Sequence, residues 1–574
     1  MASLVKKRIG GKSYYYAREC KRVDGKPKIV WQKYLGKADD IVRRMSEDAS
    51  ADPPQPREAF ITEFGAVAAL YGLADRLQIT AAIDRHVPKS GDGPSVGTYL
   101  LLAILNRCVA PCSKAAVAEW FEATALRRWL DVEARQLTSQ RFWDNMDRVS
   151  RACIPRIEEE ITARMVREFD IDLRRILFDG TNFFTFIDTF NERATLPQRG
   201  KSKEGRTSLR IVGVGLMAAA DFGVPLFHRT YPGNQPDSTT FASVLPELVA
   251  RYRALHQGVE HLTLVFDKGN NSAENLQNLE ATPYHFVGSL VPTQHADLLK
   301  IPRRRFRSLE DDGLPGVTAY RTRKEVYGAR RTIIVTHNDN LFVAQTRTLL
   351  REIGKRQTRL QELQRSLHAW RQRRDRRGNP PTVAGTQKKV AAWMKARHMK
   401  ELFHFDIREQ NGRTALTYRF DHAAWQRLQR TLLGKTLLFT DNDEWSDAEI
   451  VQAYRSQHHV ESAFRCVKDP HHLSIRPQFH WTDQKIEVHV LCCVLAYMLC
   501  ALLRRELHHK GIDRSIRAIL DDLSGIREVG VIFPPHRARR GHEPTPVIKT
   551  TLSALSDDQR TLYNALDLER RRGT

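Results

Sequence analysis

At 574 residues, the chain is long enough for about three or four domains, and its 41% apolar content excludes an intrinsically disordered chain. Its 91 Lys and Arg residues exceed its 67 Asp and Glu residues, which gives a formal net charge of +24. An excess of this size indicates an extended anionic partner, of which nucleic acid is the usual one. A basic protein that binds no polyanion is the alternative.

The sequence carries no signal for export or membrane insertion. Its start, MASLVKKRIGGK, lacks the apolar stretch of a signal peptide. The longest apolar run, from Val490 to Leu503, has 14 residues and is too short to span a bilayer. The eight Cys residues show neither disulfide nor metal-site spacing. We therefore expect a cytoplasmic protein with no membrane partner.

Residues 1–50 are expected to form an N-terminal β-hairpin region. Polar residues alternate with apolar or aromatic ones in KSYYYARECKRV and KPKIVWQKYL, on either side of the turn DGK. A single hairpin is only marginally stable alone, so it must pack on another surface, and DNA is one candidate. The following ADPPQP, residues 51–56, is typical of a linker.

Residues 57–168 are expected to be helical, because apolar residues recur there at helical spacing. Thr138 or Ser139 is a suitable N-cap for the segment that ends at Val149. Several short helices that start with Arg, Gln and Trp could form a helix-turn-helix DNA reader. A plain helical bundle has the same sequence pattern, so both interpretations stay open.

Residues 172–299 show a different period, which predicts three strands, a helix, a strand, a helix and a strand. This order is typical of a mixed sheet with helices packed on it. Residues 300–445 depart from the rhythm and are interpreted as an α+β insertion with a long helix from about 341 to 376. The basic run 371–377 is either a solvated helix end or a phosphate contact.

The helical pattern returns in residues 446–533, whereas the tail, residues 534–574, is uninformative. One predicted helix, residues 447–468, has an apolar stripe at Val460, Phe464 and Val467. The next long segment is apolar on nearly all sides, so it is expected to be buried.

Three acidic residues stand in settings where water is expected to be scarce. Asp179 follows the apolar run ILF, and Asp267 follows TLVF, at or beside the ends of two predicted strands. Carboxylates are costly in such places unless they are paired or bind a cation. If the two strands are neighbours, the aspartates could converge, and a third oxygen ligand would then complete a site for hard divalent ions.

Glu461, at the border of the buried face of helix 447–468, could supply that third ligand. Tyr454 and Lys468 stand seven residues to either side of it, about two helical turns or 10 Å away along the same ridge. A cap or a surface salt bridge is the ordinary role of any one such acid. Three acids in distinctive settings within one basic chain favour a shared site.

These residues resemble the DDE transposases of bacterial insertion sequences, in the superfamily with a Tyr–Arg–Glu–Lys signature. Tyr454, Glu461 and Lys468 match the spacing of the signature, whereas Gln457 occupies its arginine position and Arg455 is an imperfect substitute. The segments FDGTNFFTF and LVFDKGNNSAEN resemble the two aspartate motifs, and the N-terminal hairpin with YLGK fits the long-insertion branch. The resemblance covers most of residues 11–530.

The resemblance implies a ribonuclease H-like catalytic domain, with a mixed five-stranded sheet and helices, interrupted by the insertion. It further implies that Asp179, Asp267 and Glu461 hold two Mg²⁺ ions, with Mn²⁺ as a substitute, about 4 Å apart. Such an enzyme nicks the ends of its element and joins them to target DNA. Lys468 would hold phosphate, and Tyr454 would pack against the DNA near the cleavage site, with Arg455 or Gln457 at the arginine position.

The partners implied by the resemblance are double-stranded DNA, as transposon ends and as target, and a second copy of the chain. The place of action is the nucleoid of a bacterial cell. Two alternatives stay open: a nuclease of the same fold that cuts DNA without joining it, and a decayed or repurposed copy that binds DNA without cutting it. Loss of one acid would indicate the second alternative, and all three acids are present.

Overall fold

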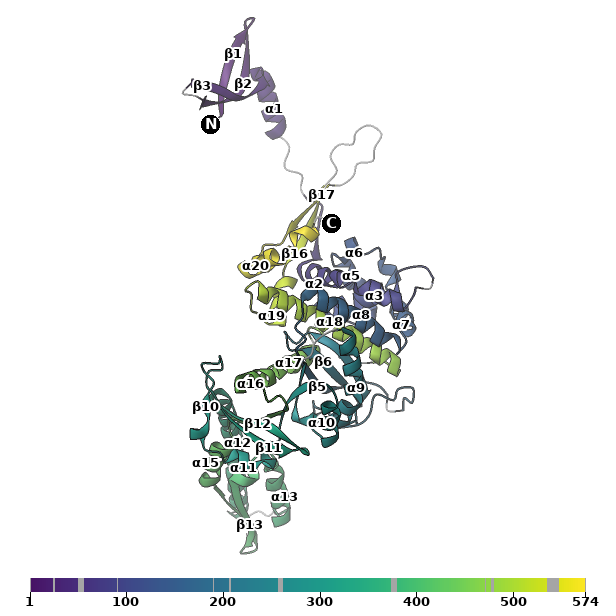
Figure 1. Ribbon diagram of the computed structural model, residues 1–574. Coiled ribbons are helices and arrows are strands. Elements are labelled where there is room, and N and C mark those ends of the chain that lie inside the picture. Colours follow the sequence, from purple (N-terminus) through teal and green to yellow (C-terminus); the bar gives the residue numbers. More distant parts are fainter. Residues whose placement is uncertain are drawn as a thin grey trace.

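The computed structural model describes most of the chain (Figure 1). The described residues are 2–23, 26–49, 56–89, 91–188, 190–205, 208–255, 262–372, 379–469, 471–475, 479–533 and 547–572. Most of the predicted linker, the first two residues of the hairpin turn DGK, most of the basic run 371–377 and the first part of the C-terminal tail lie outside these residues.

The N-terminal region is a three-stranded antiparallel sheet of β1 (Ala2–Ile9), β2 (Lys12–Val23) and β3 (Lys26–Gly36), followed by α1 (Ala38–Ala49). The predicted hairpin is the pair β2–β3, and β1 extends it to three strands. This sheet and α1 lie at one end of the molecule, apart from the remaining elements (Figure 1).

A helical region follows the short strand β4 (Glu58–Glu63). Its α-helices are α2 (Gly65–Arg76), α3 (Ile79–His86), α4 (Val96–Val109), α5 (Val117–Glu122), α6 (Leu126–Trp129), α7 (Ser139–Arg148) and α8 (Cys153–Phe169). Of the two predicted caps of α7, Thr138 is the N-cap, because its hydroxyl accepts a hydrogen bond from the Arg141 backbone N–H at 3.3 Å.

The C-terminal tail contains structure that its sequence did not indicate. β4 pairs with β16 (Arg527–Phe533), and β16 pairs in turn with β17 (Val547–Leu552), so residues from both ends of the chain share one antiparallel sheet. Two helices complete the tail: α20 (Asp557–Ala565) and α21 (Glu569–Arg572).

The core is a mixed sheet that shows the predicted order of three strands, helix, strand, helix and strand. The elements are β5 (Arg175–Phe184), β6 (Ile211–Ala219), β7 (Pro225–Pro232), α9 (Asp237–Leu255), β8 (Thr263–Phe266), α10 (Ala273–Glu280) and β9 (His285–Ser289). β5, β6 and β7 are antiparallel neighbours, whereas β8 runs parallel to β5 and β9 runs parallel to β8. The strands are almost wholly buried, as their apolar runs predict.

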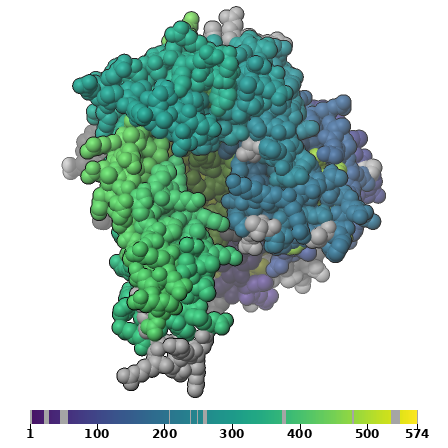
Figure 2. Space-filling model, turned by 90° about the horizontal axis from the view of Figure 1, so that it is seen from below, coloured from purple at the N-terminus to yellow at the C-terminus, as the bar shows by residue number. Residues whose placement is uncertain are grey.

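Among the described residues the sheet has nine strands where the sequence led us to expect five, because strands of the insertion continue it beyond β9. β15 (Lys435–Thr440) pairs with β9 and with β12 (Ala329–Asn338). β12 pairs in turn with β11 (Val317–Val326), and β11 pairs with β10 (Arg307–Ser308) at the edge of the sheet. The other elements of the insertion are α12 (Asp339–Gln372), α13 (Val383–Trp393), α14 (Met399–Leu402), β13 (Phe403–Gln410), β14 (Arg413–Phe420) and α15 (His422–Thr431). Seen from below, the molecule is hollowed between the insertion, in green, and the blue and teal residues of the helical region and core (Figure 2).

The helix predicted over residues 447–468 is two helices, α16 (Asp447–Arg455) and α17 (Gln457–Val467), which meet at Ser456. After them come α18 (Asp483–His509) and α19 (Ile516–Ser524). By length and composition α18 could cross a membrane, but 94% of its most apolar window is buried inside the protein, as in a central core helix. This burial agrees with the prediction for that segment.

Candidate active site

Two aspartates lie side by side on neighbouring strands, Asp179 in the middle of one and Asp267 just past the end of the other. Asp179 belongs to β5, and Asp267 directly follows β8. These strands are parallel, with Phe178 opposite Phe266, so the two aspartates are the next residues along adjacent strands. Neighbouring strands are about 4.8 Å apart. Both aspartates are half-buried, so they form a pair of carboxylates at one edge of the apolar core.

The side chain of Asp179 is on the face of the sheet that α17 covers. Successive side chains of a strand point to opposite faces. Phe178 packs against Phe241 of α9, with ring centroids 5.3 Å apart. Thr181 points the other way and accepts a hydrogen bond from Lys468, the residue that follows α17. Asp179 is two residues before Thr181 on the strand, so both side chains point to the face that α17 covers.

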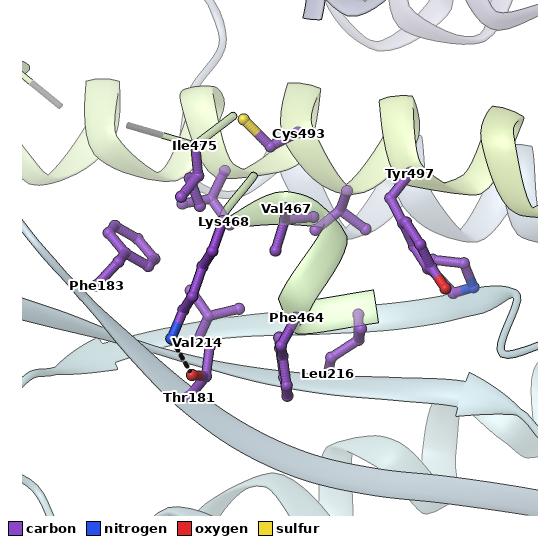
Figure 3. Close-up of a pocket in the computed structure, with 13 residues that line it drawn as sticks. Thr181, Phe183, Val214, Leu216, Phe464, Val467, Lys468, Ile475, Cys493 and Tyr497 are labelled. Carbon is purple, nitrogen blue, oxygen red and sulfur yellow. Dashed lines mark hydrogen bonds between the residues drawn. The ribbon is translucent and has the colours of Figure 1, made fainter. Parts of the chain in front are cut away.

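Two polar contacts anchor α17 along β5. Gln457 Nε2 donates to the Phe178 carbonyl oxygen at 3.2 Å, and Lys468 Nζ donates to Thr181 Oγ1 at 2.7 Å (Figure 3). Asp179 lies between these contacts on the strand, and Glu461 lies between them on the helix. Because Glu461 follows Gln457 by four residues, both are on the same face of α17. The helix thus carries Glu461 along the segment of β5 that holds Asp179.

Asp267 is held by two hydroxyl groups. Ser289 Oγ, at the end of β9, donates to Asp267 Oδ1 at 3.1 Å. The Tyr454 hydroxyl lies 2.9 Å from Ser289 Oγ and 3.3 Å from Asp267 Oδ1. Burial raises the pKa of Tyr454 well above its ordinary value, and the negative charges of Asp267 and then Glu461 add to the rise. Tyr454 is therefore within electrostatic reach of both carboxylates.

These contacts show how two residues that were expected to bind DNA are held in the structure. Tyr454 is turned into the protein, where its hydroxyl orients Asp267, and the hydroxyl does not face outward onto DNA. Gln457 is only 5% exposed and links α17 to β5, so its side chain is not placed for direct DNA contact. The break at Ser456 also means that Tyr454 and Lys468 do not share one helical ridge. Arg455, by contrast, is exposed.

Lys468 and a lysine that the sequence analysis missed bring positive charge to the strand of Asp179. Lys468 Nζ lies 3.7 Å from a Glu204 carboxylate oxygen in addition to its bond with Thr181. It forms the polar rim of a small apolar pocket that includes Phe183, Val214 and Phe464 (Figure 3). Lys203 Nζ donates to the Gly180 carbonyl oxygen at 2.5 Å. In the sequence, the only sign that Lys203 brings positive charge to this strand is the basic character of its loop, GKSKEGR.

The donor chemistry of the acids fits a hard divalent cation, because Asp179, Asp267 and Glu461 offer only carboxylate oxygens. The two aspartates are adjacent, and Glu461 is exposed on the helix that covers them. Within the described part of the chain, however, no three His, Cys, Asp or Glu side chains are grouped closely enough to hold a metal ion. The pair of aspartates is thus formed, whereas Glu461 is not drawn into one tight cluster with it.

Comparisons with known proteins give little further information. No protein-family model matches the chain, and no curated protein matches it in sequence. Among solved structures, it is similar to a piggyBac transposase in a synaptic complex with hairpin DNA. The identity is 10% and the TM-score is 0.34, over 82% of each chain. A TM-score this low does not define a fold, so the proposal below depends on the site itself.

Proposed function

We propose that this chain is a DNA transposase, which cleaves strands at the ends of its element and joins them to target DNA. The observation that carries the proposal is the pair Asp179 and Asp267 on adjacent parallel strands, beneath the helix that carries Glu461 and leads to Lys468. A net charge of +24 suits a partner made of phosphates. Double-stranded DNA is the proposed substrate.

The catalytic domain is proposed to be ribonuclease H-like. Three antiparallel strands, β5, β6 and β7, are followed by β8 and β9, which are parallel to β5, and the spatial order of these five is β9-β8-β5-β6-β7. Strands of the insertion would enlarge this sheet at its β9 edge. The last helices, α16 and α17, return to the face where the aspartates lie, and in this proposal they bring Glu461, nearly two hundred residues after Asp267, to the same site.

Asp179, Asp267 and Glu461 would hold Mg²⁺, or Mn²⁺ in its place, and the ions when bound would activate the attacking hydroxyl and stabilise the leaving oxygen. The chain's own residues prepare that site. Ser289 and Tyr454 fix the orientation of the Asp267 carboxylate. Lys468, at the end of α17, would place a cation beside the DNA phosphate under attack.

An assay of cleavage and joining tests the proposal. The full-length chain is incubated with Mg²⁺ and a plasmid that carries the DNA flanking its gene on both sides. We expect nicking at the two ends and their transfer to a second plasmid. Glu461→Gln and Asp179→Asn should bind the ends but cut neither, whereas the exposed Glu444→Gln serves as the matched control and should stay active.

The same assay separates the alternative functions. Cleavage without transfer would identify a nuclease, and binding without cleavage by the unaltered chain would identify a non-catalytic DNA-binding protein. Normal cleavage by Asp179→Asn or Glu461→Gln would remove that residue from the site. We further propose that the active form is a dimer on paired DNA ends, which sedimentation with and without DNA would measure.

A further inference from the structure

A cluster of aromatic side chains is exposed on two loops, one that follows β5, the strand of Asp179, and one that precedes α18. Phe186 and Phe190 follow β5 and are 45% and 89% exposed, whereas Phe479 and Trp481 precede α18 and are 54% and 67% exposed. Each such ring offers a large apolar area. Grouped exposure of this kind marks an interaction site more often than isolated exposed apolar residues do. We call these four residues the aromatic platform.

Contacts between the two loops order part of the platform. Phe186 and Phe479 stack with ring centroids 5.3 Å apart and planes inclined by 23°. The ring of Phe184, at the end of β5, meets Phe186 edge-on at 5.5 Å. Asn191 Nδ2 donates to the Trp481 carbonyl oxygen at 3.1 Å. The rings of Phe186 and Phe479 are therefore held in place by β5 and by each other, and the backbone at Trp481 is tied to the loop that follows β5.

A second set of bonds fastens the same two loops through Asp483, the first residue of α18. Its carboxylate accepts hydrogen bonds from the backbone N–H of Thr195 at 2.8 Å and of Leu196 at 2.9 Å. It also accepts one from the Thr195 hydroxyl at 2.5 Å. A loop tied in this way loses little conformational entropy when a ligand binds to it.

The surroundings of the platform are basic. Residues 185–210 contain six Lys and Arg residues and three Asp and Glu residues. Arg193, Arg199 and Lys201 are exposed. Through Lys203, whose ammonium group bonds the Gly180 carbonyl oxygen, the loop is joined to the strand of the candidate active site. The combination favours an anionic partner with flat apolar groups over an apolar protein surface.

The distance from the active site suits a DNA strand. Phe186 follows Asp179 by seven residues, which is about 23 Å along an extended chain. Successive nucleotides of a stacked DNA strand rise about 3.4 Å, so the platform lies within about seven nucleotides of the proposed scissile phosphate. In a duplex the base faces are covered by their neighbours, and only unpaired or unstacked bases could lie on these rings.

We propose that the aromatic platform stacks unpaired bases of the DNA strand that leaves the active site. The proposal rests on the proposed function, because it takes DNA as the substrate. Phe190 and Trp481, the most exposed rings, make the stacking contacts, and the neighbouring basic side chains bind the backbone phosphates. Stacking on an aromatic ring tolerates any base, so the platform adds affinity for single strands without reading their sequence.

The test compares single-stranded and duplex binding by the full-length chain. The variants are Phe190→Ala, Trp481→Ala and the double variant, with Trp481→Phe as the conservative exchange and Phe405→Ala, an exposed aromatic of the insertion, as the control. We expect each alanine exchange to weaken oligothymidylate binding about tenfold. Duplex affinity should stay unchanged, and Trp481→Phe should retain most of the single-strand affinity. Circular dichroism confirms that each variant is folded.

The outcomes distinguish failure of the platform from failure of the proposed function. A chain that binds duplex DNA normally, but whose oligothymidylate affinity is absent or insensitive to the alanine exchanges, refutes the platform alone. A chain that binds neither form of DNA refutes the proposed function as well. If the exchanges instead abolish self-association in sedimentation without DNA, the patch is a protein interface and the proposal is wrong.

Discussion

Replacement of Tyr454 by Phe separates two roles for this residue, because it removes the hydroxyl group and keeps the ring. In the structure the hydroxyl has one proton and two nearby acceptors, and Ser289 Oγ at 2.9 Å is closer than Asp267 Oδ1 at 3.3 Å. The loss of one such bond costs about 1 kcal/mol. Ser289 still donates to Asp267 at 3.1 Å, so the carboxylate is loosened but not released. If that cost falls on the transition state, cleavage slows about fivefold.

The assay is the single-turnover cleavage rate at saturating DNA, measured for Tyr454→Phe, Ser289→Ala and the double variant. Because both hydroxyls act on Asp267, the double variant should lose less than the product of the two single losses. DNA affinity should be unchanged in Tyr454→Phe. If Tyr454→Phe binds DNA more weakly but cleaves at an unchanged rate at saturating DNA, the positioning role is refuted. Tyr454 would then contact DNA directly, as the sequence analysis predicted.

Three further predictions concern the scaffold and the metal. Gln457→Ala leaves the Phe178 carbonyl oxygen without its side-chain donor and should lower the free energy of unfolding by about 1 kcal/mol, as urea titration measures; an unchanged value would mean that water replaces the amide. Burial favours a raised pKa for Glu158, but His228 and Arg251 outweigh it and hold the pKa below the ordinary 4.5. The unaltered chain should therefore lose stability as pH falls below about 4.5. Glu158→Gln should be about 3 kcal/mol less stable at neutral pH, and its free energy of unfolding should depend less on pH in acid. An equal dependence of the free energy of unfolding on acid pH in the two chains would contradict this role of Glu158. Mg²⁺ or Mn²⁺ should raise the melting temperature of the unaltered chain but not of Asp267→Asn, and an equal rise in both would place the ion elsewhere.

The sequence was sufficient to predict the strands of the core and their acids. The apolar runs that precede Asp179 and Asp267 indicate buried strands, although β5 continues past Asp179 to Phe184. The pairing of those strands is a tertiary property, and no local pattern reveals it. The same limit explains the error in the strand count, since β15 joins β9 through pairs such as Leu438 with Ser289, which are far apart in sequence.

The orientation of the signature residues could not be read from spacing alone. Residues 447–468 have a continuous helical pattern, and Ser456 keeps right-handed helical dihedrals, φ −61° and ψ −14°, so nothing local marks the boundary between α16 and α17. Once the helix divides there, Tyr454 faces β9 and Gln457 faces β5. The aromatic platform was missed because its rings come from two distant loops, each of which looks unremarkable alone.

The central claim is that Asp179, Asp267 and Glu461 serve one metal site, and iron-mediated affinity cleavage tests it most directly. Fe²⁺ in place of Mg²⁺, with ascorbate and peroxide, generates radicals that cut the nearby polypeptide backbone. We predict three sets of fragments, with breaks near residues 179, 267 and 461, that disappear together in Asp267→Asn and on addition of excess Mg²⁺. Breaks near the two aspartates without any near Glu461, or breaks that persist in Asp267→Asn, would contradict the shared site.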